Sequence, residues 1–152
     1  KLEGGVRICE TVRTLTRNGI PDLGHIGLTT QSINQLGGAR VQGKSMQMAD
    51  EILTDAKSIE DAGAFAVVIE LVPEKLGRLI TEQLSIPTIG IGAGIHCDGQ
   101  VLVFHDMLGL SVVPVPRHAK AFAQLGSITK EAVGRYLNDV KSGEFPTSKQ
   151  SF

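Results

Sequence analysis

Apolar runs and amphipathic stretches alternate along the chain. Apolar residues that recur every three or four positions predict α-helices, because they share one helical face. These helices are expected over residues 6–19, 45–63, 73–84, 119–126 and 127–143. Continuous runs of small and β-branched residues predict buried strands between the helices. The strands are expected within residues 1–5, 20–28, 65–70, 86–94 and 100–106.

Local signals bound the expected helices. Gly19 is placed to end the first helix, and Ser45 is a residue type that caps a helix N-terminus. Gly63 then ends the helix that Ser45 begins, and Pro73 suits the first turn of the next one. A glycine-rich loop is expected over 36–45. The positions of the 73–84 helix that should face the core are Leu76, Leu79, Ile80 and Leu84.

Buried strands without in/out alternation, each followed by a helix, indicate a parallel sheet with both faces covered. This pattern defines the α/β class. Periodicity leaves two architectures open, a doubly wound sheet and a (β/α)8 barrel. A complete barrel takes about 250 residues, whereas this chain has 152. We expect one domain over residues 1–152.

Composition narrows the classes of partner. The net charge is −1 and no long Lys/Arg cluster is present, which argues against nucleic acid and acidic membrane surfaces. The ligand is therefore expected to be a small molecule. No apolar run approaches the roughly 18 residues of a membrane helix, and the chain starts without the apolar core of a secretory signal. The two cysteines lie outside any CxxC motif, so a reducing compartment, the cytoplasm, is expected.

Polar residues gather where the predicted strands end. Along the chain these are Lys1 and Glu3, His25, Glu70, the glycines of "GIGAG" at 90–94, and His105 with Asp106. The carboxyl ends of parallel strands meet at one edge, and ligands bind there. The sequence therefore predicts one site at this edge of the sheet.

Glu70 carries the strongest chemical signal. It follows the apolar run "FAVVI" and precedes "LVP", so its carboxylate is expected in a partly desolvated pocket. Desolvation disfavours the charged form and so makes a carboxylate a better base. We interpret Glu70 as a general base, with a solvated loop residue as the alternative.

The other strand-end residues leave alternatives open. His25 is either a site residue or a buried, hydrogen-bonded histidine. Lys1 and Glu3 share one strand face, so both can reach one site, or they form a surface ion pair. The "GIGAG" glycines fit either a phosphate cradle or tight packing.

Four further residues invite a metal interpretation that their spacing does not support. His96, Cys97, His105 and Asp106 match no closed zinc site, and we predict none. The roles of these four residues stay open. Cys9 lies on an apolar helical face and is expected to be an inert core residue.

Six stretches then carry a much more specific pattern. They are "KLEGG", "GIPDLGHIGLTTQSINQLGG", "QGK", "DAGAFAVVIELVP", "IPTIGIGAGIHCDGQVLVFHDMLGL" and the closing "SGEFP" with "SF". In this order they resemble the ketopantoate (3-methyl-2-oxobutanoate) hydroxymethyltransferase family. The resemblance covers almost every residue of the chain.

The resemblance implies a (β/α)8 barrel of the phosphoenolpyruvate/pyruvate type. This chain would supply its C-terminal part, from about the end of strand 4, plus C-terminal helices. The implied reaction transfers a hydroxymethyl group from 5,10-methylenetetrahydrofolate to the oxo acid 3-methyl-2-oxobutanoate, with Mg²⁺ as cofactor, and gives 2-dehydropantoate for pantothenate synthesis. A ring-shaped homo-oligomer, often a decamer, is the implied assembly.

The same resemblance implies individual roles. It makes Lys1 and His25 substrate contacts, Glu70 the general base that removes the C3 proton, and Glu3 a metal-site carboxylate for which contact through water is allowed. In the family, two aspartates from earlier strands bind the metal directly and a serine contacts substrate, and none of these lies in this sequence. Thr30 and Gln150 stand where the family usually has proline and histidine. Neither is expected to touch the chemistry.

Two rival functions remain. One is a Mg²⁺-dependent C–C lyase of the isocitrate lyase or phosphoenolpyruvate mutase kind, which keeps the barrel. The other is an inactive fragment or a small-molecule-binding half, which is favoured if Lys1 is the biological start. In that case the sheet edge would be open and the metal aspartates absent.

Overall fold

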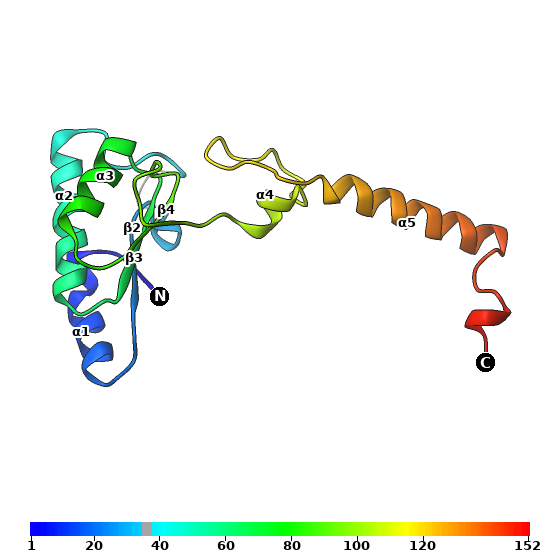
Figure 1. The fold of residues 1–152 in the computed structure, drawn as a ribbon, viewed down its shortest axis with the longest axis horizontal. Coiled ribbons are helices and arrows are strands. Elements are labelled where there is room, and N and C mark those ends of the chain that lie inside the picture. The colour runs from blue at the N-terminus through cyan, green and yellow to red at the C-terminus, as the bar shows by residue number, and fades with distance from the viewer. Residues whose placement is uncertain (35–37) are drawn as a thin grey trace. The chain divides into compact units, whose positions relative to one another are not determined.

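The computed structural model describes residues 1–34 and 38–152 (Figure 1). The first two positions of the predicted glycine-rich loop lie outside the described residues. Clustering of contacts separates the chain into two compact units, Lys1–Val101 and Leu102–Phe152. The expectation of a single domain stays a prediction.

The first unit is built on a parallel sheet of five strands. In chain order they are β1 (Leu2–Glu3), β2 (Leu23–Gly27), β3 (Ala66–Glu70), β4 (Thr88–Ile91) and β5 (Gly99–Gln100). Strand order in the sheet is the same as chain order, and every neighbouring pair is parallel. The register pairs Glu3 with His25 and Gly27 with Glu70. The predicted parallel α/β class is therefore confirmed.

Three helices cover one face of this sheet. They are α1 (Cys9–Arg17), α2 (Met46–Asp61) and α3 (Glu74–Gln83), all on the same side in Figure 1. A doubly wound sheet reverses its strand order and places helices on both faces. A monotonic order with all crossover helices on one face is the arrangement of a (β/α)8 barrel wall. We expected both faces to be covered, but the second face carries a pocket, into which the ends of the first three strands bring polar side chains.

The core lies between the sheet and these helices. Val67 and Ile69 of β3 point into it together with Ile26 of β2, and Ala56 of α2 and Ile80 of α3 close over them, with all five side chains at most 1% exposed. Alternation along β3 follows from this packing, because Val68 and Glu70 then point to the opposite face.

The predicted helix boundaries in this unit are largely confirmed. The hydroxyl of Ser45 accepts a hydrogen bond from the N–H of Met48 at 3.3 Å, and so caps α2. Gly19 and Gly63 follow their helices with φ of +78° and +96°, the left-handed backbone that favours glycine. One core position is wrong, because Leu79 is 39% exposed on the outer face of α3.

The predicted strand over 100–106 is mostly wrong. β5 ends at Gln100, and the next residues lead into α4 (Phe104–Leu108), the first helix of the second unit. His105 and Asp106 therefore lie on a helix and do not close a strand. A short apolar run fits a strand or a helix equally by periodicity, and Val103 and Phe104 here are 52% and 60% exposed instead of buried.

The tail contains one helix where we predicted two. α5 (Leu125–Ser142) is followed by Gly143 with φ of +77°, as expected, but residues 119–124 are not helical. A 3-10 helix, η3 (Ser148–Gln150), closes the chain, and its Gln150 Oε1 accepts from the N–H of Thr147 at 3.1 Å. None of the described helices is long and apolar enough to cross a membrane.

Asp98 ties the base of β5 to β4 and gives a testable pH dependence. Its Oδ2 accepts from the N–H and the hydroxyl of Thr88 at 2.8 and 3.0 Å, and these hydrogen bonds lower the pKa of Asp98. A lowered folded-state pKa contributes stability above the unfolded pKa, and that stability is lost as the pH falls through the folded value.

We expect Asp98→Asn to reduce the free energy of unfolding at pH 7 by about 1 kcal/mol, because a neutral acceptor bonds more weakly than a carboxylate and the site is exposed. The deficit should shrink below about pH 4, where the wild-type carboxyl is protonated as well. Urea unfolding of the wild type and the variant at pH 7 and below about pH 4 measures the difference in the free energy of unfolding. A deficit that is independent of pH would contradict the role of the charge.

Candidate active site

Four predicted site residues come together at the carboxyl edge of the sheet. Lys1 and Glu3 lie on β1 or beside it, His25 lies on β2 and Glu70 ends β3. They line a pocket of about 560 Å³. Its remaining walls come from the sheet and from residues just beyond the strand ends: Leu23, Thr30, Val68, Ile89, Ile91, Gln100 and Val101. The structure thus brings these four side chains together at one pocket, and their roles as site residues stay predictions.

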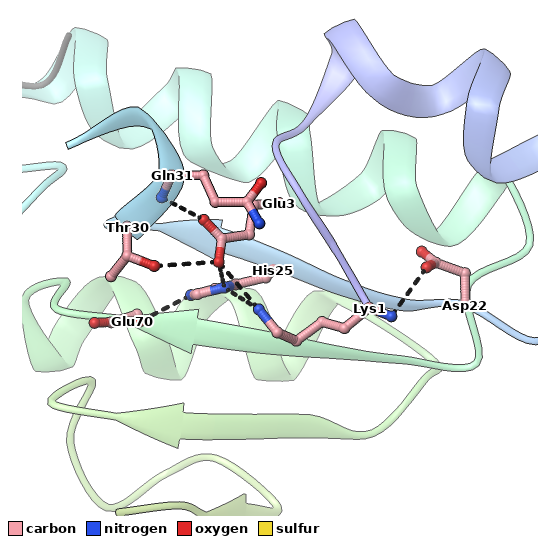
Figure 2. Close-up of polar contacts among 7 residues, drawn as sticks. All are labelled: Lys1, Glu3, Asp22, His25, Thr30, Gln31 and Glu70. Carbon is pink, nitrogen blue, oxygen red and sulfur yellow. Dashed lines mark hydrogen bonds and ion pairs between the residues drawn. The ribbon is translucent and has the colours of Figure 1, made fainter. Parts of the chain in front are cut away.

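Lys1 and His25 form the tightest contact of the cluster (Figure 2). Lys1 Nζ lies 2.8 Å from His25 Nδ1 and 3.2 Å from Glu3 Oε1. An ammonium group has donors and no acceptor, so Nδ1 must accept this hydrogen bond. The proton of a neutral His25 ring is then on Nε2, the nitrogen that faces Glu70. The imidazole is 4% exposed, so its orientation is fixed by packing as well as by Lys1.

Glu70 sits beside that ring nitrogen. His25 Nε2 is 2.9 Å from Glu70 Oε2, and the Glu70 side chain is 15% exposed. The distance is short, but the carboxylate lies out of line with the N–H direction, so Nε2 has no aligned acceptor among the described residues. The contact is therefore an electrostatic interaction without an aligned hydrogen bond. It leaves the buried Nε2–H of His25 able to donate to another oxygen. Glu70 occupies a partly desolvated pocket, as the sequence predicted.

The backbone around Glu70 is tightly held. Its carbonyl oxygen accepts from the N–H of Leu28 at 2.9 Å. Leu71, the next residue, has φ of +47°, a conformation that costs a bulky residue roughly 1–3 kcal/mol and persists only where its surroundings impose it. The N–H of Leu71 donates to Ile91 on β4, and its carbonyl accepts from Gln42. These bonds fix the direction in which the Glu70 side chain leaves the sheet.

Glu3 is surrounded by hydrogen-bond donors. Besides Lys1, its Oε1 accepts from the Thr30 hydroxyl at 3.2 Å, and its Oε2 accepts from the N–H of Gln31 at 2.9 Å (Figure 2). Burial acts to raise the pKa of Glu3, but the Gln31 N–H, the Lys1 ammonium and the nearby His25 together lower it. The carboxylate is therefore charged at neutral pH, with only 7% of its side chain exposed.

Thr30 corrects the sequence interpretation. We expected this residue to lie away from the chemistry, yet its hydroxyl contacts Glu3 and lines the pocket. Thr30 begins the 3-10 helix η2 (Thr30–Ser32), directly beyond the end of β2. Its place just after a strand end was the available signal, since Glu3 and His25 were selected by that rule. Gln100 at the end of β5 was also missed and also lines the pocket.

The "GIGAG" glycines support the packing alternative. Gly94 has φ of +89°, and a Cβ added there would collide with Glu74 at the start of α3. A Cβ on Gly77 of α3 would collide with the carbonyl of Ala93. The loop therefore packs backbone to backbone against α3, for which the absence of a side chain is required.

The remaining candidates are not among the residues that line this pocket. His96 pairs with Glu74 at 3.3 Å, with both side chains substantially exposed. Asp106, in the second unit, accepts a hydrogen bond from Ser111 at 2.6 Å. Cys97 belongs to the core of the first unit, and burial raises the pKa of Cys9, in keeping with an inert thiol.

The chain is similar to known proteins over nearly all of its length. Residues 1–148 match the family model described as ketopantoate hydroxymethyltransferase. The 3-methyl-2-oxobutanoate hydroxymethyltransferase of Carboxydothermus hydrogenoformans is 54% identical over 152 residues, which are 100% of this chain and 55% of the relative. The same-named proteins of Anaeromyxobacter dehalogenans and Dehalococcoides mccartyi are 51% and 53% identical over the full chain, which spans 50% and 54% of their length. The chain thus spans about half the length of the curated relatives it matches.

Proposed function

The chain belongs to the ketopantoate hydroxymethyltransferase family, and on this basis we propose that the protein transfers a hydroxymethyl group from 5,10-methylenetetrahydrofolate to 3-methyl-2-oxobutanoate, giving 2-dehydropantoate. The observation that carries the proposal is the pocket in which Glu70, His25 and Lys1 converge. A reaction of this type needs a base for a carbon-bound proton and cationic or N–H groups for the oxygens of the acid.

Two groups in the pocket suit the oxygens of the oxo acid. The Lys1 ammonium is half exposed toward solvent, with 41% of its side chain accessible, and an ammonium binds carboxylates as a point charge. The Nε2–H of His25 is buried and lacks an aligned acceptor among the described residues. An oxygen of the bound acid or of the new hydroxyl group would satisfy this donor, whose burial is otherwise unfavourable.

Glu70 is the group placed to take the C3 proton. Its main chain is held by the backbone hydrogen bonds of residues 70–71, and its carboxylate lines the same pocket as Lys1. The proton moves from carbon to a Glu70 oxygen, and the carbon becomes a nucleophile for the one-carbon donor. His25, fixed by Lys1 on its other nitrogen, holds its N–H on the Glu70 side of the ring. The donor proposed for a substrate oxygen therefore lies directly beside the proposed base.

Glu3 fits magnesium in a limited way. Magnesium prefers carboxylate oxygens and keeps several waters, and Glu3 Oε2 receives a single donor from the described residues. Oε1 is already crowded by donors, so a water-mediated contact through Oε2 suits it best. No group of three or more metal-ligating side chains occurs within residues 1–34 and 38–152. A bound magnesium ion would supply positive charge to stabilise the oxo oxygen as the C3 proton leaves.

The assay of the reverse reaction separates this function from its rivals. We expect the full-length protein that carries this sequence to cleave 2-dehydropantoate to 3-methyl-2-oxobutanoate only when tetrahydrofolate and Mg²⁺ are both present. Mass spectrometry of the reaction mixture measures the formation of 3-methyl-2-oxobutanoate. Cleavage without tetrahydrofolate would favour the C–C lyase. Absence of turnover in both directions would favour a binding or inactive protein. The expected cytoplasmic location and homo-oligomeric state stay predictions.

A further inference from the structure

We propose that Thr30 is a positioning residue in this chain, whose hydroxyl holds the carboxylate of Glu3 in a fixed orientation toward the proposed metal site. The inference rests on the proposed function, since it assigns to Glu3 the magnesium-site role. It concerns a residue that sequence interpretation had set aside. The starting observation is the hydrogen bond from Thr30 Oγ1 to Glu3 Oε1 at 3.2 Å.

Two consecutive residues hold the two oxygens of one carboxylate. Thr30 donates to Oε1, and the N–H of Gln31 donates to Oε2 at 2.9 Å (Figure 2). Both donors come from neighbouring residues of the short helix η2 beyond β2, so the backbone limits how far apart they can lie. Two donors at fixed separation define the plane of a carboxylate, whereas one donor leaves it free to rotate. The Gln31 bond alone would therefore leave Oε1 unfixed from this side.

The other neighbours of Oε1 cannot replace the hydroxyl. His25 Nδ1 is 3.3 Å from Oε1, but this nitrogen accepts from Lys1 and so has no proton to give when the ring is neutral. Lys1 donates to Oε1 at 3.2 Å through a long and partly exposed side chain. In the proposed reaction its ammonium also serves the substrate carboxylate. Because an ammonium has three N–H donors, Lys1 can keep its hydrogen bond to His25 Nδ1 while it serves the substrate carboxylate. Thr30 is then the side-chain donor to Oε1, among the described residues, that has no second role in the proposed reaction.

The expected consequence concerns the lone pairs that Glu3 presents to the pocket. With its plane fixed, Oε2 directs its unused lone pair in a constant direction, toward the water through which it would hold magnesium. Groups that orient metal-site ligands typically contribute 10–100-fold to metal affinity. Thr30 is exposed at the surface of the pocket, so removal of its hydroxyl should affect this orientation far more than the stability of the fold.

The test uses the full-length protein with Thr30→Val, which keeps the shape and removes the hydroxyl, and Thr30→Ser, which keeps the hydroxyl. Calorimetric titration with MgCl₂, in the presence of saturating 3-methyl-2-oxobutanoate, should show about tenfold weaker binding for Thr30→Val. Thr30→Ser should stay within about threefold of the wild type. Thermal unfolding of both variants checks that each is folded, and Thr30→Ala replaces Thr30→Val if the valine variant is not.

The outcomes separate the two proposals. Unchanged magnesium affinity in Thr30→Val, or an equal loss in Thr30→Ser, overturns the role of the hydroxyl and leaves the proposed function intact. A wild-type protein that binds neither magnesium nor the oxo acid overturns the proposed function and the role of Thr30 with it. Tenfold weaker binding in Thr30→Val together with rescue by Thr30→Ser is the result that supports the inference.

Discussion

Replacement of Glu70 by glutamine is expected to abolish exchange of the C3 proton of 3-methyl-2-oxobutanoate while the oxo acid still binds. Glutamine keeps the shape of the side chain but has no basic oxygen comparable to a carboxylate. A positioned general base typically contributes 10²–10⁴-fold to a rate, so the exchange rate should fall by roughly this factor. Binding should persist because the groups proposed to hold the acid, Lys1 and His25, are unchanged.

The measurement follows deuterium uptake at C3 by NMR in D₂O, with Mg²⁺ present and the full-length protein that carries this sequence. Glu74→Gln is a matched control, since it makes the same chemical change at a carboxylate with a side chain 59% exposed at the start of α3. It lies outside the residues that line the pocket. Exchange at the wild-type rate in Glu70→Gln would remove Glu70 as the base.

Gly27→Ala is expected to destabilise the protein strongly, because two unfavourable effects coincide at this position. Gly27 ends β2 with φ of +84°, and an added Cβ would collide with the carbonyl oxygen of Glu70. That carbonyl is held by the N–H of Leu28, so it cannot move aside freely. The left-handed backbone and the collision together should lower the free energy of unfolding by about 3 kcal/mol or more.

Gly19→Ala separates the two contributions. Gly19 has φ of +78°, close to that of Gly27, but no atom lies within 4 Å of the added Cβ. Its cost should be the backbone contribution alone, about 1–2 kcal/mol. Urea unfolding of both variants gives the difference directly. Equal losses would mean that the strand end can shift to accommodate the methyl group, and that Glu70 is less firmly held than its hydrogen bonds suggest.

The sequence predicted the site better than the tail of the chain. Lys1, Glu3, His25 and Glu70 were selected because each was expected at the end of a strand, and the register of β1, β2 and β3 does bring these strand ends together. This rule works because parallel strands joined by helices must place their carboxyl ends at one edge. The same rule failed at His105, where the apolar run after Gln100 leaves the sheet and enters α4.

Thr30 shows the limit of single-chain patterns, because its place beyond a strand end marks it as a candidate but does not identify Glu3 as its partner. Its hydroxyl reaches Glu3, which is 27 residues earlier in the chain, and no local spacing encodes a contact that the pairing of β1 with β2 creates. The tautomer of His25 is a similar case, since it follows from Lys1 lying 2.8 Å away. The sequence identified residues whose type and position along the chain mark them as candidates. Residues that matter because of their neighbours in space were identified only from the structure. Leu71, with its positive φ, belongs to the second group as well.

The agreement between strand order and chain order also bears on synthesis. Because each strand of the first unit pairs with the strand just before it in the chain, its partner has already left the ribosome when it emerges. The first three pairings each close a connection that contains an α-helix, and the pairing of β4 with β5 closes a shorter one without a helix. The entropy cost of closing a loop grows with its length. Within the first unit the sheet can therefore grow one strand at a time in chain order during translation, and Glu70 can reach its place beside His25 before β4 emerges from the ribosome.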